Sequence, residues 1–122
     1  MSLPLALIFE DDPKLAELYN MVLKQCQYET QVIGSGKEAQ KSLQTLSPDL
    51  ILLDIHLPYV SGLEILKQFQ ADKRFKDTLL IVMTADLYTV KDLDGIVDHI
   101  LLKTHGITKL RELATARINP DR

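Results

Sequence analysis

The fold of this chain is decided by one short stretch, Leu50-Ile51-Leu52-Leu53-Asp54-Ile55-His56-Leu57-Pro58. Four apolar residues lead without interruption to one carboxylate, that of Asp54. A short, unbroken aliphatic run is typical of a strand buried on both faces, as in a parallel sheet covered by helices. This pattern places Asp54 at the carboxyl end of a central strand, where open α/β sheets bind their ligands. The alternative is that Asp54 only ends the strand and caps the next loop.

The composition bounds the size and the class of the protein. The chain has 122 residues, of which 46% are hydrophobic, and this is the length of a single domain with a real core. A net charge of -3 gives no indication of nucleic-acid binding. The single cysteine, Cys26, excludes an internal disulfide and a cysteine-based metal site.

The two ends of the chain and its hydropathy lead to an expectation about location. No apolar run reaches membrane-spanning length and no signal-peptide pattern is present. We therefore expect a cytoplasmic protein that does not contact a membrane. Residues 1–122 are treated as one domain, compatible with excision from a longer protein, and residues 1–3 are compatible with a vector-derived start.

Apolar runs alternate with helical patterns along the whole chain. Helix starts are indicated by Asp12-Pro13, by capping boxes at Ser35 and Ser61, and by Thr108. Such alternation predicts an α/β fold of five βα units, with a doubly wound parallel sheet and helices on both faces. The expected strands cover residues 5–9, 30–33, 50–54, 79–83 and 100–102.

The segment from Asp86 to Asp98 is the irregular part of this pattern. Its apolar residues fit helical spacing only loosely. Four aspartates and Gly95 lower the helix propensity of the segment further. We predict a short or irregular fourth helix here.

Polar side chains follow four of the five expected strands. Because the carboxyl ends of parallel strands lie at one edge of a sheet, these side chains should meet there. Each has an ordinary role when taken alone: a carboxylate can favour the start of the next helix, a threonine can end a strand, and a lysine can be solvated. Their coincidence at one edge favours a functional site. The residues are Glu10 and Asp11 after the first strand, Asp54, Thr84 and Lys103.

The residue types indicate a particular chemistry. Clustered carboxylates repel one another, and a divalent cation such as Mg²⁺, which takes carboxylate, water and phosphate oxygens, relieves this repulsion. A carboxylate beside Mg²⁺ can attack phosphorus and form an aspartyl-phosphate. The transferred group then needs positive charge and hydrogen-bond donors, which Mg²⁺, Lys103 and Thr84 would supply. The sequence therefore predicts phosphoryl transfer to Asp54.

These motifs together resemble a response-regulator receiver domain, from two-component signalling. The resemblance covers the chain from Leu5 to about Ile118. It implies a flavodoxin-like fold with the sheet order 2-1-3-4-5 and with the site where the strand order reverses. The motifs that carry it are Glu10-Asp11, residues 52–58 around Asp54, Gly62, Thr84-Ala85 and Lys103.

The resemblance also implies roles for single residues. Asp54 would accept the phosphoryl group from a phosphohistidine of a histidine kinase or phosphotransfer protein. Glu10, Asp11, Asp54 and the main-chain carbonyl of His56 would hold Mg²⁺. Thr84 would move toward the phosphoryl oxygens, and Lys103 would pair with them.

The implied protein is a signalling switch and not an enzyme, with at most Mg²⁺-dependent self-phosphorylation and self-dephosphorylation. A downstream protein or an attached output domain would respond to its phosphorylation, without direct contact between this domain and nucleic acid. We expect a monomer or a weak homodimer.

Three features depart from the usual pattern of the family. Lys103 is followed by Thr104 where proline is usual, so we expect either a trans bond with a rearranged loop or a cis bond retained to aim Lys103. Ile100, beside His99, stands where a switching aromatic residue is often found. The segment from Thr84 to Lys103 is shorter than usual by about one helical turn. The output face should therefore be atypical.

Two other functions compete with the switch. The first is a receiver fold that binds partners without phosphorylation, and the altered region between Thr84 and Lys103 leaves room for it. The second is an aspartate-nucleophile phosphatase. Such an enzyme typically needs a general acid two residues after the nucleophile, and that position holds His56, so this alternative ranks last.

Overall fold

The structure is a computed structural model that describes all residues except 1–2, 57–61, 87–92, 94–96, 104 and 119–122. Strands and helices alternate along the described chain, as the sequence predicts. In order they are β1 (Leu5–Phe9), α1 (Pro13–Gln25), β2 (Glu29–Ile33), α2 (Gly36–Thr45), β3 (Leu50–Asp54), α3 (Gly62–Ala71), the 3₁₀ helix η1 (Lys73–Phe75), β4 (Leu79–Thr84), β5 (His99–Leu102) and α4 (Ile107–Ile118).

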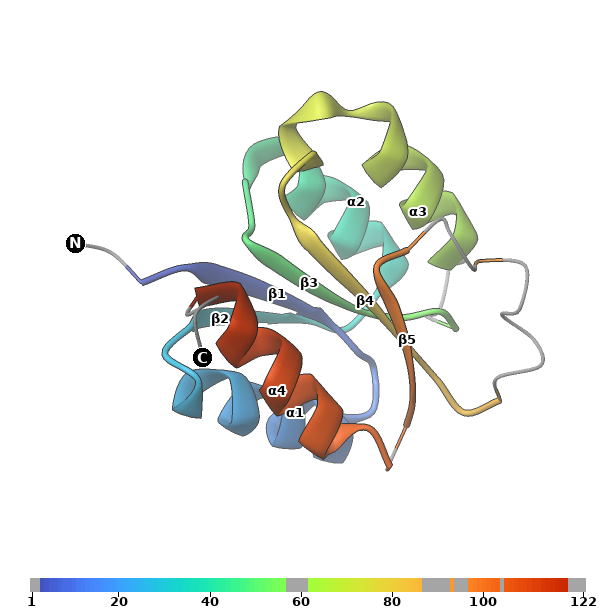
Figure 1. Cartoon of the computed structure of the whole chain (residues 1–122). Coiled ribbons are helices and arrows are strands. Elements are labelled where there is room, and N and C mark those ends of the chain that lie inside the picture. Colours follow the sequence, from blue (N-terminus) through green and yellow to red (C-terminus); the bar gives the residue numbers. More distant parts are fainter. Residues whose placement is uncertain (1–2, 57–61, 87–92, 94–96, 104, 119–122) are drawn as a thin grey trace.

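The five strands form one parallel sheet in the order β2-β1-β3-β4-β5. Figure 1 shows α1 and α4 on one face of this sheet and α2 and α3 on the other. This is the predicted doubly wound α/β architecture, and the strand order reverses between β1 and β3. The fold prediction is therefore confirmed.

Strict alternation along the central strands divides the core into two clusters. In β1, Ala6 and Ile8 pack under α1 and α4, whereas Leu7 and Phe9 pack under α2 and α3. β3 divides in the same way, with Leu50 and Leu52 on the first face and Ile51 and Leu53 on the second. Because successive side chains of a strand point to opposite faces, a strand buried on both faces must be apolar throughout. This explains the unbroken aliphatic runs of the sequence.

The helix starts agree with the sequence in two places and differ in a third. The side chain of Asp12 accepts hydrogen bonds from the first turn of α1, and the Ser35 hydroxyl accepts one from the N–H of Glu38 at 3.2 Å. Thr108 does not cap the last helix, and that prediction is wrong. α4 already begins at Ile107, and the carbonyl of the buried Gly106 accepts the N–H of Leu110 at 2.8 Å. Ser61 lies outside the described residues.

Most of the expected irregular fourth helix also lies outside the described residues. Leu93 is described, and it is buried in the cluster under α2 and α3. The N–H of Val97 donates to the carbonyl of Leu93 at 3.3 Å. The N–H of Asp98 donates to the carbonyl of Leu80 near the start of β4, and the Asp98 carboxylate accepts the N–H of Leu80. The short or irregular form of this segment stays a prediction.

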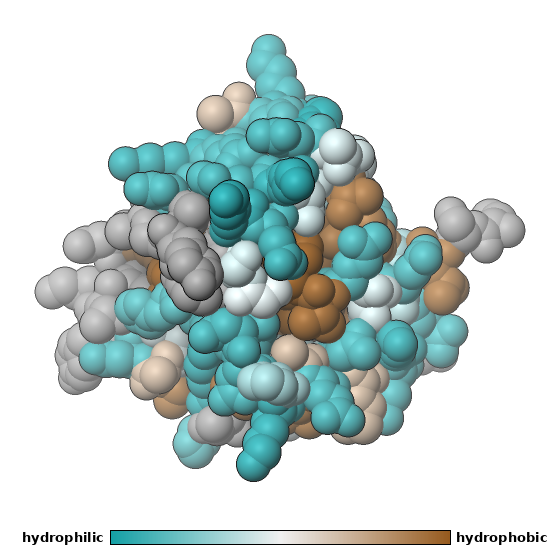
Figure 2. All heavy atoms as spheres, turned by 180° about the vertical axis from the view of Figure 1, so that it is seen from behind, coloured by the Kyte–Doolittle hydropathy of each residue, from teal (hydrophilic) through white to brown (hydrophobic). Residues whose placement is uncertain are grey.

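The surface is mainly hydrophilic on the side opposite to the view of Figure 1. Figure 2 shows polar side chains over most of this face and a small hydrophobic area near its centre. Among the helices that the structure describes, none has the length and apolar character needed to cross a membrane.

Candidate functional site

Glu10, Asp54 and Lys103 meet at the carboxyl edge of the sheet. Asp54 is the last residue of β3, and Lys103 directly follows β5. Glu10 follows β1, and its N–H donates to the carbonyl of Ile33 at 3.0 Å, so the pairing of β1 with β2 continues through it. The N–H of Lys103 donates to the carbonyl of Thr84 at 2.7 Å and ties the ends of β4 and β5 together. The sheet itself therefore brings these distant residues together.

The ammonium of Lys103 lies between two buried carboxylates. Its Nζ donates to Oδ2 of Asp54 at 2.9 Å and to Oε2 of Glu10 at 3.2 Å. Oε1 of Glu10 is 3.1 Å away from the same Nζ, but this contact lacks hydrogen-bond geometry. Only 2% of the surface of Glu10 and of Asp54 is exposed. Two acidic groups can be buried here because one cation is shared between them.

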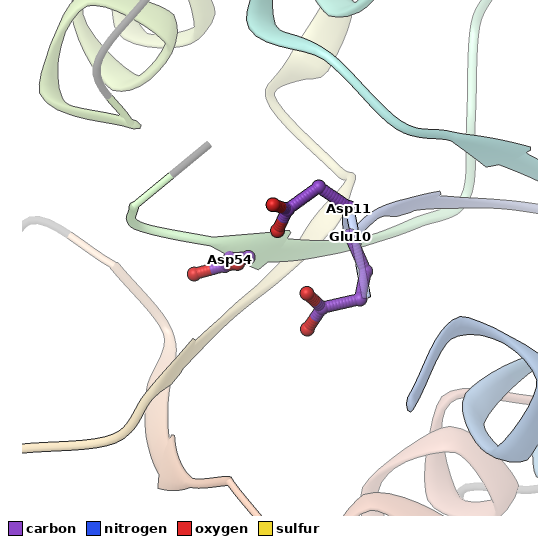
Figure 3. Close-up of side chains that lie close together, drawn as sticks. All are labelled: Glu10, Asp11 and Asp54. Atoms are coloured by element: carbon purple, nitrogen blue, oxygen red, sulfur yellow. The ribbon is translucent and has the colours of Figure 1, made fainter. Parts of the chain in front are cut away.

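Glu10, Asp54 and Lys103 form an ion-pair cluster. The alternation of side chains along the strands explains why Glu10 and Asp54 belong to it. Glu10 and Asp54 continue the positions of Ile8 and Leu52, which face α1 and α4. Asp11 is the next residue along the extended chain after Glu10, so its side chain points to the opposite side. Figure 3 shows Glu10 and Asp11 leaving the chain on opposite sides, with the carboxylate of Asp54 beside them at the end of β3.

The electrostatics of the two buried acids differ. Burial raises the pKa of Glu10 to about 7, with a further contribution from the negative charge of Asp54. Burial also acts on Asp54, but hydrogen bonds from Lys103 and from the backbone N–H of His56 outweigh it and hold the pKa of Asp54 below its usual value. Asp54 therefore stays ionised near neutral pH, as a nucleophilic carboxylate must.

The carboxylates also fit a divalent metal ion. Glu10, Asp11 and Asp54 each offer an oxygen, and these oxygens lie within 4.8 Å of one another. Asp11 is exposed, and Oε1 of Glu10 is buried without a hydrogen-bond donor among the described residues. Hard oxygen ligands with one open side suit Mg²⁺, which keeps several waters. The backbone N–H of His56 donates to Oδ1 of Asp54 at 2.9 Å, while its carbonyl stays a predicted ligand.

Among the described residues, the side-chain hydroxyl of Thr84 bonds to Asp86 and not to the side chains of Glu10, Asp54 or Lys103. Thr84 is completely buried, and its hydroxyl donates to the carbonyl of Asp86 and accepts the N–H of the same residue, both at 3.1 Å. The strand end places Thr84 near the site, but its hydroxyl is engaged locally. The predicted movement of Thr84 toward a phosphoryl group would break these two bonds.

The structure describes only some of the positions at which the sequence departs from the usual receiver pattern. Ile100 is partly buried against the cluster under α2 and α3. Thr104 lies outside the described residues, so both expectations for the Lys103–Thr104 peptide bond stay open.

Sequence reasoning assigns Tyr19 only to the apolar face of the first helix. The structure buries it in the cluster under α1 and α4, with its hydroxyl unpaired among the described residues. The charges of Glu10, Lys103 and Asp54 all act on this hydroxyl, so it lies near the acidic edge. The signal in the sequence is a polar tip on an otherwise aliphatic helix face, since a buried tyrosine O–H usually needs a partner.

With this fold and this edge established, comparison with known families identifies the class of protein. Residues 6–115 match the response regulator receiver domain. The chain belongs to this family, and the predicted membership is confirmed.

Individual relatives agree with this assignment. The DNA-binding response regulator MtrA of Mycolicibacterium smegmatis is 32% identical over 112 residues, which are 92% of this chain and 49% of that protein. The chain thus spans about half the length of the curated relatives it matches. Among solved structures, a CheY-like receiver domain from Methylobacillus flagellatus is 26% identical, with a TM-score of 0.84 and coverage of 95% and 99% of the two chains.

A further structure bears on the metal site. The response regulator TrrA of Thermotoga maritima, solved in complex with Mg²⁺ and BeF, is 29% identical to this chain with a TM-score of 0.82. The match covers 94% of this chain and 99% of that one. The family therefore includes a similar fold that binds Mg²⁺.

Proposed function

We propose that this domain is a phospho-accepting switch in which Asp54 is the acceptor. The donor is a phosphohistidine on a histidine kinase or phosphotransfer protein. The observation that carries the proposal is the position of Asp54: its carboxylate is ionised, lies 2.9 Å from the Lys103 ammonium, and shares a metal-sized cluster with Glu10 and Asp11. Membership of the receiver family supports the same role.

The proposed reaction is a single transfer. A carboxylate oxygen of Asp54 attacks phosphorus, the bond from phosphorus to the imidazole nitrogen breaks, and the electron pair returns to that nitrogen. The product is an acyl phosphate on Asp54. Bound Mg²⁺ would neutralise charge on the phosphoryl oxygens. The Mg²⁺ bound in the similar TrrA structure supports this requirement.

The residues of this chain perform the positioning. Glu10, Asp11, Asp54 and the His56 carbonyl would hold the metal. Lys103 would remain beside Asp54 and pair with a phosphoryl oxygen, because its ammonium is already placed there. The hydroxyl of Thr84 would leave Asp86 and donate to another oxygen. That movement biases the conformation of the β4 end, and a downstream protein or attached domain would respond to it.

The test is intact mass spectrometry after incubation with Mg²⁺ and a small-molecule phosphodonor. We expect one phosphoryl adduct on the wild type, and none on Asp54→Asn or without Mg²⁺. Asp49→Asn is the matched control, because Asp49 is also near an end of β3 but accepts the N–H of Leu5 at the opposite edge. An adduct that persists on Asp54→Asn would reject Asp54 as the acceptor.

The phosphorylation-independent binding module remains the alternative. The aliphatic Ile100, half-buried on β5, is the observation that favours it, because it cannot couple to Thr84 as a rotating aromatic ring with a polar tip would. Backbone amide NMR of the phosphorylated domain separates the two functions. A switch shifts the amides of β4 and β5, whereas the binding module leaves them unchanged outside the immediate site.

A further inference from the structure

Two buried polar atoms close to the acidic edge lack hydrogen-bond partners among the described residues. They are the phenol oxygen of Tyr19 and Oε1 of Glu10. Tyr19 is 1% exposed and Glu10 is 2% exposed. Buried polar groups in native proteins are nearly always hydrogen-bonded, so each unpaired one requires an explanation. Oε1 of Glu10 lies 3.1 Å from Nζ of Lys103 without hydrogen-bond geometry, so it can still accept a hydrogen bond, and the phenol of Tyr19 is a donor without an acceptor.

The architecture brings the two groups toward the same place. Ile8 of β1 packs in the same cluster as Tyr19, and Glu10, two residues further along the extended chain, faces the same side. Oε2 of Glu10 accepts the N–H of Asp12 at 3.2 Å, so this carboxylate sits at the start of α1. Tyr19 lies six residues after Pro13, roughly 9 Å along the axis, and helical side chains lean back toward the start of the helix. The phenol therefore extends toward the end of α1 at which the Glu10 carboxylate lies.

The charges that act on the phenol agree with this placement. Burial raises the pKa of Tyr19 to about 12, and among the neighbouring charges that of Glu10 contributes most. Lys103 and Asp54 contribute as well. The hydroxyl therefore lies within the electrostatic field of the ion-pair cluster.

Tyr28 provides an internal comparison. It is buried in the same cluster, and burial likewise raises its pKa to about 12. The charges acting on it are those of Arg117, Cys26 and Asp49, which lie outside the ion-pair cluster. Its hydroxyl donates to the carbonyl of Ala114 at 2.9 Å. One buried tyrosine thus bonds within the fold, and the other has its hydroxyl available to the site.

We propose that Tyr19 is a positioning residue of the metal site, whose O–H is linked to Oε1 of Glu10 through one water. This water-mediated link orients the Glu10 carboxylate for metal binding. This inference rests on the proposed function, because it treats Glu10 as part of a Mg²⁺ site. Groups that orient metal ligands in this way typically change metal affinity by roughly 10- to 100-fold when they are removed.

The test compares Tyr19→Phe with Tyr28→Phe, since each removes one hydroxyl and keeps the ring. Mg²⁺ affinity is measured by backbone amide NMR titration, and stability by urea unfolding. We expect Tyr19→Phe to weaken Mg²⁺ binding about tenfold, with an unfolding midpoint no lower than that of Tyr28→Phe. Tyr28→Phe should lower the midpoint, because it leaves the Ala114 carbonyl unpaired, and should keep Mg²⁺ affinity within twofold of the wild type.

A measurement on the wild type does not depend on how the variants fold. In protein carrying ¹³C-labelled tyrosine, the Cζ resonance of Tyr19 should move during the Mg²⁺ titration with the same dissociation constant as the amides. The Cζ resonance of Tyr28 should not move. A Tyr19 resonance that stays fixed while the amides titrate would overturn the inference.

The outcomes separate this inference from the proposed function. If the wild type and Tyr19→Phe bind Mg²⁺ equally well, Tyr19 has no positioning role, and the proposed function is unaffected. If both variants lose affinity equally, the effect is general to the core and the inference is also overturned. If the wild type binds no Mg²⁺, the proposed function fails and this inference fails with it.

Discussion

At the scale of single residues, the shared lysine decides the balance of charge at the site. Lys103 is the cation that contacts both Glu10 and Asp54. Removing one partner of a buried ion pair is costly because the remaining charges are left uncompensated. The same removal would leave the site around Glu10 and Asp54 more negative and therefore more attractive to a divalent cation.

We predict that Lys103→Met lowers the free energy of unfolding by about 2–3 kcal/mol at pH 8 without Mg²⁺. The variant should bind Mg²⁺ more tightly than the wild type but accept a phosphoryl group poorly. Urea unfolding, a Mg²⁺ titration and intact mass measure the three effects. Lys109→Met is the control, because Lys109 forms only an exposed pair with Glu112 at 3.5 Å and should change stability by less than about 0.5 kcal/mol.

The loss of stability in Lys103→Met should depend on pH. The pKa of Glu10 in the folded protein is about 7, above its ordinary value of 4.5, so the folded state binds a proton more readily than the unfolded state. Without the ammonium this difference grows, and the pKa of Asp54 also rises. Stability of the variant relative to the wild type should therefore recover as the pH falls from 8 through 7 toward 5. A deficit that is constant over this range would contradict the charge explanation.

At the scale of elements, the close approach of Gly106 to the end of β5 constrains the start of α4. Gly106 is buried at the start of α4, and a Cβ at this position would lie 2.9 Å from both the Leu101 Cβ and the Leu102 carbonyl oxygen. A backbone oxygen cannot rotate away as a side chain can. The glycine is thus required by packing between a strand and the following helix.

We predict that Gly106→Ala destabilises the fold by about 1–3 kcal/mol, as overpacking of a dense core does. Gly34→Ala is the matched control, since its added Cβ would meet only the Glu10 carbonyl oxygen at 3.9 Å. That variant should stay within about 0.5 kcal/mol of the wild type. Urea midpoints compare the two. Equal losses in both variants would show that the α4 contact has no special importance.

At the scale of the whole molecule, metal binding and folding are linked. Mg²⁺ should bind only where β1 and β3 are correctly paired, because Glu10 and Asp11 are distant from Asp54 in sequence. A ligand that binds only the folded state stabilises it by about 2.7 kcal/mol at a hundredfold excess over its dissociation constant. The melting temperature should therefore rise with Mg²⁺ concentration.

We predict that Asp11→Asn reduces this Mg²⁺-dependent rise while leaving stability without metal nearly unchanged, because Asp11 is exposed. Asp12→Asn is the matched neighbour. It should keep both the cap of α1, since asparagine caps as well as aspartate, and the full response to Mg²⁺. Thermal melts at increasing Mg²⁺ measure both variants. A full response in Asp11→Asn would exclude Asp11 as a ligand.

The sequence by itself determined the alternation of strands and helices, because a strand buried on both faces must be aliphatic and an amphipathic helix must repeat every 3.6 residues. It also determined which residues lie at strand ends, so Glu10, Asp54 and Lys103 could be assigned to one edge before any distance was known.

Only the tertiary structure decided what these residues contact. Which carboxylates share the ammonium, the local bonds of the Thr84 hydroxyl and the close approach at Gly106 depend on distances between separate elements. Local spacing carries no information on such distances. For the same reason, the sequence alone indicates only that Tyr19 belongs to the apolar face of a helix. Only the packing of α1 against the sheet shows that its ring is buried and that its hydroxyl is unpaired among the described residues.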